Sequence, residues 1–93
     1  MWEDAVSSLS SEAADLSGSS LTRIYHIHLM YNITQLNLSN NQLCNLNGVN
    51  LLQKLTTLDA SNNQICCVKG LHNMPSLVSL NLENNSELNS CIY

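Results

Sequence analysis

Ile33-Thr-Gln-Leu-Asn-Leu-Ser-Asn-Asn-Gln-Leu43 recurs with the same pattern further along the chain. It returns as Leu55-Thr-Thr-Leu-Asp-Ala-Ser-Asn-Asn-Gln-Ile65 and then as Leu77-Val-Ser-Leu-Asn-Leu-Glu-Asn-Asn85, each time after a step of 22 residues. The apolar positions coincide in all three copies, and so does an asparagine. Self-similarity at a fixed step of this length predicts a repeat protein, in which each repeat forms one coil of a solenoid.

Each repeat predicts a short, half-buried strand. Leu36-Asn-Leu38 and Leu80-Asn-Leu82 alternate apolar and polar residues with period two. A single strand with one apolar face cannot bury that face by itself. Parallel stacking of the repeats, about 4.8 Å apart, would pair the backbones and merge the leucines into a continuous core.

The rest of each repeat has to return the chain to the start of the next strand. A step of 22 residues is too short for a strand and a full crossover helix. We therefore expect segments 44–54 and 66–76 to be extended chain and 3₁₀ turns, with Gly48 and Gly70 permitting tight bends.

One asparagine per repeat lies where the strand should turn away from the sheet. Its side-chain amide can both donate and accept hydrogen bonds, so it can satisfy backbone groups that the turn leaves without partners. We expect an internal ladder, with a structural rather than a catalytic role, formed by Asn41, Asn63 and Asn85.

A 22-residue repeat that contains L-x-x-L-x-L-x-x-N-x-L resembles the leucine-rich repeat. It is similar to the 22-residue subclass found in the leucine-rich regulatory subunit of protein phosphatase-1 and in ciliary and centrosomal proteins. The resemblance implies an α/β leucine-rich-repeat solenoid of about four coils. Short parallel strands would form its concave face, and 3₁₀ or extended turns its convex face.

The repeat divides the chain into a leading segment and one domain. Residues 1–10 do not fit the repeat, and we interpret them as an N-terminal cap or a tail. The repeat domain is expected to span residues 11–93, with a degenerate first repeat at 11–32, complete repeats at 33–54 and 55–76, and an incomplete one at 77–93.

Composition and charge exclude several classes of partner. The net charge of -4, with only three basic residues, disfavours nucleic acid and anionic membranes. No apolar run is long enough for a transmembrane helix, and the N-terminus lacks the features of a signal peptide. We therefore expect a cytoplasmic protein, and the resemblance adds cytoskeleton, centrosome and cilium or flagellum as locations.

The cysteines and histidines do not predict a metal site. No C-x-x-C pair exists, and His26-Ile-His28 has no thiol or carboxylate beside it. Cys44 and Cys66 occupy equivalent positions in neighbouring repeats, where a disulfide is geometrically feasible. In a reducing cytosol, however, we expect free thiols that are partly packed on the return segments.

No catalytic or cofactor-binding motif accompanies the repeat, so we expect neither an enzyme nor a cofactor. The outward positions of the strands are then the first candidates for binding a partner protein, through hydrogen bonds to a polar or basic segment. These concave-face candidates are Asp15, Gln35, Asn37, Thr57, Asp59, Ser79, Asn81 and Glu83. Ala13, Ser17, Ser39 and Ser61 continue the same rows.

A second candidate surface is the end of the solenoid. The final repeat presents an apolar layer that the residues after it cannot fully cover, so we expect a partner, a second copy or further sequence to contact it. The end-face candidates are Leu77, Leu80, Leu82, Leu88 and Tyr93.

The repeat and the absence of catalytic motifs favour a non-catalytic protein–protein interaction module. We expect it to act as an adaptor or scaffold in a larger cytosolic assembly, and the resemblance points towards cytoskeletal or axonemal complexes. One alternative is a regulatory subunit that binds a phosphatase or kinase through the concave face. Another is the N-terminal piece of a longer protein.

Overall fold

The computed structural model describes residues 13–86 and 88, apart from the side chain of His28. The N-terminal cap or tail and Tyr93 lie outside the described residues, as does the second imidazole of the histidine pair. In the described part, each repeat contributes one short strand. The strands are β1 (Ala13–Asp15), β2 (Gln35–Asn37), β3 (Thr57–Asp59) and β4 (Ser79–Asn81).

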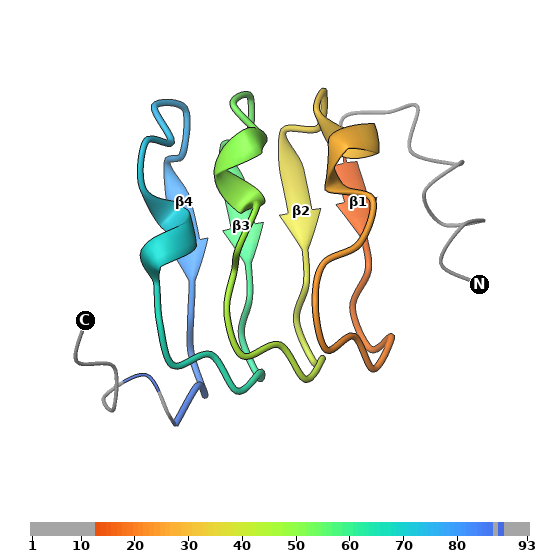
Figure 1. The fold of residues 1–93 in the computed structure, drawn as a ribbon, viewed down its shortest axis with the longest axis vertical. Coiled ribbons are helices and arrows are strands. Elements are labelled where there is room, and N and C mark those ends of the chain that lie inside the picture. The colour runs from red at the N-terminus through yellow and green to blue at the C-terminus, as the bar shows by residue number, and fades with distance from the viewer. Residues whose placement is uncertain (1–12, 87, 89–93) are drawn as a thin grey trace.

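The four strands form one parallel sheet in chain order, β1-β2-β3-β4 (Figure 1). Their register is the step of the sequence repeat, since Leu58 pairs with Leu36 on one side and with Leu80 on the other. The pairing continues past the strands, where Leu38 N–H donates to the carbonyl of Asp59 at 2.7 Å. The predicted solenoid of stacked, parallel coils is therefore confirmed.

In the described part of the chain, three 3₁₀ segments lie on the return side of the coils, in front of the strands in Figure 1. They are η1 (Ile27–Met30), η2 (Val49–Leu51) and η3 (Lys69–Leu71). The rest of each return segment is extended chain and turns. The structure thus confirms the prediction that 3₁₀ turns replace crossover helices.

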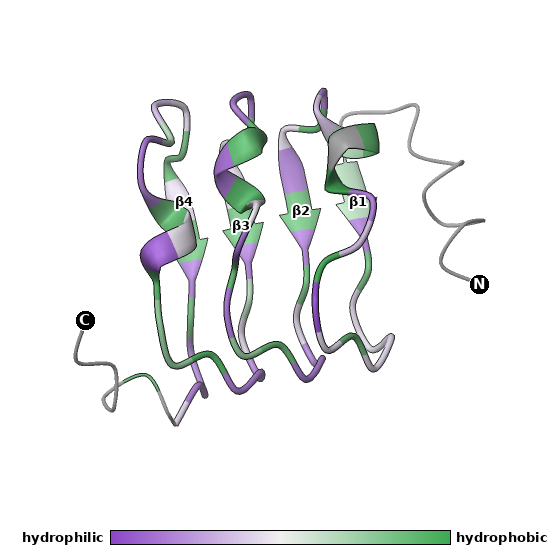
Figure 2. Cartoon of the chain, viewed as in Figure 1, coloured by the Kyte–Doolittle hydropathy of each residue, from purple (hydrophilic) through white to green (hydrophobic). Residues whose placement is uncertain are grey.

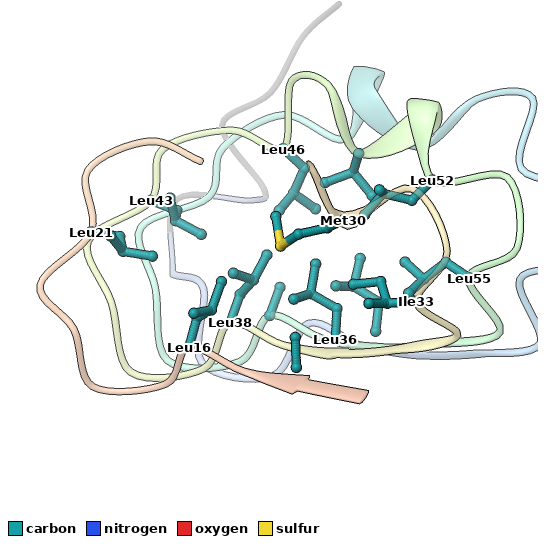
Figure 3. Packing of buried hydrophobic residues seen from close by; sticks show 14 of the residues in the cluster. Leu16, Leu21, Met30, Ile33, Leu36, Leu38, Leu43, Leu46, Leu52 and Leu55 are labelled. Atoms are coloured by element: carbon teal, nitrogen blue, oxygen red, sulfur yellow. The ribbon is translucent and has the colours of Figure 1, made fainter. Parts of the chain in front are cut away.

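The core lies between the strands and the return segments. Figure 3 shows Leu36 and Leu38 on the strand side, facing Met30 and Leu46 from the return side. Each of these four side chains is at most 2% exposed. Ala60 is also fully buried, at the position that Leu38 occupies one coil earlier. The apolar residues of the repeat are therefore buried because the coils stack in register.

The first coil keeps the register although its sequence has diverged. Ala14 and Leu16 are buried beside β2, at 5% and 2% exposure. Leu21 and Met30 are buried on the return side, at 7% and 1%. The smaller residues of this repeat therefore still form a coil of the same solenoid.

The third coil departs from the repeat on its return side. Segment η3 begins at Lys69, whereas a step of 22 from Val49 would place its start at Leu71. Val68 is 42% exposed, although its equivalent Leu46 is fully buried. Equivalent residues in the sequence therefore do not have equivalent environments here.

Gly70 has a different role from the one predicted. Gly48 has φ +93°, which fits a tight bend, but Gly70 is not among the residues with positive φ. A Cβ on Gly70 would lie 2.1 Å from the carbonyl oxygen of Leu46 and 2.5 Å from its carbon. Gly70 is thus needed because the third coil's backbone lies directly against the second coil's backbone.

Candidate functional site

The strand face is positioned by the asparagine ladder beneath its carboxyl end. Asn63 Nδ2 donates to the carbonyls of Leu38, Ala60 and Ser61, at 2.9, 3.1 and 3.1 Å. Its Oδ1 accepts a hydrogen bond from Leu43 N–H at 3.0 Å. Each ladder residue is 7% exposed and joins its own coil to the preceding one. The predicted ladder is therefore present, with a structural role.

The last residue of each strand forms a local turn with its side chain. Asp59 Oδ1 accepts from Ser61 N–H at 3.0 Å and from Ser61 Oγ at 2.7 Å. Asn37 makes the same pair of bonds with Ser39, at 3.0 and 2.7 Å. A carboxylate oxygen and an amide oxygen can both accept this hydrogen bond, so the last residue of a strand can be either Asp or Asn. The strand-end residues are Asp15, Asn37, Asp59 and Asn81.

These turns correct one part of the sequence prediction. Ser39 and Ser61 were expected to face outward with the rest of the row. They are instead buried, at 7% and 6% exposure, because each hydroxyl turns back to the side chain two residues earlier. They stabilise the strand ends and are not available to a partner.

The structure brings five of the predicted concave-face residues around one shallow hollow of about 380 Å³ on the outer side of β1, β2 and β3. Ala14 and Leu36, the central residues of two strands, are among the residues that line it. Ala13 also lines it, together with the five predicted residues Asp15, Gln35, Asn37, Thr57 and Asp59. We call these five residues the strand-face site. Ser79 and Asn81 continue its rows on β4, and Glu83 follows that strand.

The strand face is acidic. Among the described residues, the carboxylates are those of Asp15, Asp59 and Glu83. Asp15 and Asp59 are the last residues of β1 and β3, and Glu83 follows β4 by two residues. The Ser17 hydroxyl, and then the Ser17 N–H, donate to Asp15 and hold the pKa of that carboxyl below its ordinary value. Asp15 is therefore negatively charged at neutral pH, and no described Lys or Arg lies in the strand-face site.

Ser17→Ala is expected to raise the pKa of Asp15 towards its ordinary value, because the hydroxyl is the largest cause of the lowering. An NMR titration of the Asp15 carboxyl carbon would measure this change. A lowered pKa stabilises the folded state at pH values above the unfolded pKa, and this contribution is lost as the pH falls through the folded pKa. An unchanged Asp15 pKa in the variant would contradict the assigned hydrogen bond.

The described end-face candidates belong to the last coil. Leu80 is 42% exposed, whereas its equivalents Leu36 and Leu58 are 2% and 1% exposed. Leu77, Leu82 and Leu88 are half-buried and pack against the edge of the core. Within the described residues, the apolar layer of β4 is thus less covered than those of β2 and β3.

The described cysteines lie on the return segments and form no disulfide with one another. Cys44 is exposed, and Cys66 and Cys67 are half-buried. Backbone bonding brings the first two together, since Cys66 N–H donates to the carbonyl of Cys44 at 3.1 Å. No group of three His, Cys, Asp or Glu side chains that could hold a metal occurs in the described part of the chain.

The sequence prediction missed a group of apolar residues on the return side. Leu29, Tyr31 and Leu51 are 52%, 61% and 59% exposed. Leu29 and Leu51 are one repeat step apart, so a second apolar row outside the core positions was visible in the sequence. That row differs from the core because it ends after two coils, at Asn73.

In the described residues, no helix is long and apolar enough to cross a membrane. The sequence matches no protein-family model, and it matches no curated protein. What the structure establishes is therefore the architecture. It is a parallel sheet of short strands at 22-residue spacing, with 3₁₀ turns and buried asparagines, consistent with leucine-rich-repeat-like coils.

Proposed function

We propose that this chain is a non-catalytic protein–protein interaction module that binds a basic, polar segment of a partner through the strand-face site. In this role it acts as an adaptor or scaffold within a larger cytosolic assembly. The resemblance to the 22-residue leucine-rich repeats suggests a cytoskeletal or axonemal assembly.

The observation that carries this proposal is the hollow formed by five outward residues from three strands. Its polar side chains are already held in place by the fold, because the oxygens of Asn37 and Asp59 accept hydrogen bonds from the following turn. A partner would thus meet a surface that loses little side-chain entropy on binding. Gln35 and Thr57 are exposed between these residues and can donate and accept further hydrogen bonds.

The charge of the site defines the chemistry of the partner. Asp15 and Asp59 flank the hollow on its outer strands, β1 and β3. Arg or Lys side chains of an extended segment would complement both carboxylates, and polar side chains would fill the space between them. Because Asp15 is exposed and Asp59 is only half-buried, salt should screen both charges, and binding should weaken as the salt concentration rises.

The double variant Asp15→Asn and Asp59→Asn is expected to weaken the binding of a synthetic Arg/Ser-rich peptide by about tenfold at low salt. Both substitutions keep the Oδ1 acceptor, and Asn37 shows that asparagine makes the same turn. The fold should therefore survive while both charges are lost. Fluorescence anisotropy with the labelled peptide would measure the affinity.

Lys54→Gln is the matched control, because it changes the net charge by one unit away from the strand face. Lys54 donates to Asn32 on the return side, at 3.0 Å. If the strand-face site binds the peptide, this variant should leave the affinity nearly unchanged. The proposal would be overturned if the double variant bound the peptide with the wild-type affinity. It would also be overturned if Lys54→Gln strengthened binding, per unit of charge, by as much as the double variant weakened it.

A further inference from the structure

An exposed apolar patch lies on the return side of the first two coils. It consists of Leu29, Tyr31 and Leu51, each more than half exposed, and we call it the return-face patch. Figure 2 shows hydrophobic residues on the neighbouring turns η1 and η2, whereas η3 carries the hydrophilic Lys69. Contiguous exposed apolar residues with a polar border are typical of protein interaction sites.

The fold places the two leucines of the patch on neighbouring turns. Leu29 and Leu51 occupy equivalent positions in η1 and η2, which contact each other. Tyr31 follows η1 directly, and the next residue, Asn32, accepts a hydrogen bond from Lys54 Nζ at 3.0 Å. The ammonium group of Lys54 is thus held at the border of the return-face patch.

The return side is also the basic side of the molecule. Within 13–86 and 88, the Lys and Arg residues are Arg23, Lys54 and Lys69, and all three belong to return segments. Arg23 lies over the ring of Tyr25, 4.9 Å from its centroid, which fixes a second cation on the first coil. No described carboxylate lies on these segments, so the charges of the two faces have opposite signs.

We propose that the return-face patch is a docking surface for an acidic amphipathic segment of a second protein partner. Leucine and tyrosine side chains provide the apolar anchor, and tyrosine is enriched among residues that dominate interface energies. Lys54, at the border of the patch, selects for carboxylates beside that anchor, and Arg23 adds a second positive charge to the same side of the molecule. The chain could then bridge two partners, one basic on the strand face and one acidic on the return face.

This inference does not depend on the strand-face site, and the test separates the two. The probe is a labelled peptide of alternating Leu and Glu blocks, long enough for about four helical turns. The double variant Leu29→Gln and Leu51→Gln is expected to weaken its binding by about tenfold or more, since two anchor residues are lost. Tyr31→Ser alone should weaken it by about fivefold.

Val68→Thr is the control, because it removes a partly exposed apolar side chain from the return side outside the patch. It should leave the acidic peptide's affinity unchanged, as should the Asp15→Asn and Asp59→Asn pair. The Arg/Ser-rich peptide should bind the Leu29→Gln and Leu51→Gln variant as it binds the wild type. Equal affinities of the acidic peptide for the wild type and the patch variant would overturn the proposal. Concentration-dependent self-association that the same variant abolishes would overturn it in favour of a second copy.

Discussion

Gly70→Ala is expected to lower the free energy of unfolding by about 3 kcal/mol or more, because the added Cβ would clash with backbone atoms that cannot move aside as a side chain can. The added Cβ would lie 2.1 Å from the carbonyl oxygen of Leu46. A side chain could rotate away from such a contact, but here the second and third coils would have to separate. Urea denaturation followed by circular dichroism would measure the change.

Gly18→Ala is the matched control for this substitution. Gly18 has φ +62°, and nothing lies within 4 Å of its added Cβ, so only the left-handed backbone strain of about 1–2 kcal/mol applies. Gly48 has φ +93° and only the Ile27 side chain nearby, at 3.6 Å, and should respond similarly. If Gly70→Ala lowers the free energy of unfolding by no more than Gly18→Ala does, the second and third coils do not have the close backbone contact described here.

Asn63→Ala should lower the free energy of unfolding by roughly 1–3 kcal/mol through its effect on one backbone donor. Leu43 N–H would lose the Asn63 oxygen and remain buried without a partner. The carbonyls of Leu38 and Ala60 are better protected, because Asn41 and Asn85 also donate to them, at 2.9 and 3.0 Å. The loss of the Leu43 hydrogen bond should therefore dominate.

Asn62→Gly provides the control in the adjacent residue. Asn62 is exposed and has φ 58°, a conformation that glycine adopts without strain. Its replacement should cost only a few tenths of a kcal/mol, although Asn84 Nδ2 then loses its 2.9 Å hydrogen bond to the exposed Asn62 Oδ1. Equal losses for Asn62→Gly and Asn63→Ala in the same denaturation experiment would remove the ladder from the explanation of stability.

The sheet and its register could be predicted because one periodic constraint determines both. The step from Leu36 to Leu58 fixes which strands pair and which side chains face inward. The ladder was predictable for the same reason, since Asn63 recurs at that step beside a polar turn. Even the diverged first coil follows the register, with Ala14 opposite Leu36.

The return side was predicted less well because turns tolerate shifts that a sheet does not. A parallel ladder forces equivalent residues to stay opposite each other, whereas η3 begins two residues early relative to η2. Gly48 and Gly70 are one repeat step apart and looked equivalent in the sequence. Gly48 is needed for its left-handed φ, whereas Gly70 is needed for its close contact with the backbone of the second coil. Their different roles depend on contacts between coils, which the repeat pattern does not encode.

The strand-face site was largely predictable, since strand alternation places Gln35 and Thr57 outward and Leu36 between their rows. Alternation failed at Ser39 and Ser61, because hydrogen bonding to the strand-end side chains takes over where the strand stops. The return-face patch was missed because its two leucines directly precede the core residues Met30 and Leu52 in the sequence. Only their exposure distinguishes them from core residues.

Binding by two faces can be tested most directly with a photo-crosslinking residue placed at three exposed positions of the full chain in a native extract. Gln35 reports on the strand face, Leu51 on the return-face patch, and Gln64 on the turn between them. We predict cross-links from Gln35 to basic segments of one protein, from Leu51 to acidic segments of another, and none above background from Gln64. Equal labelling at all three positions, or none at Gln35 and Leu51, would contradict the two-face interaction.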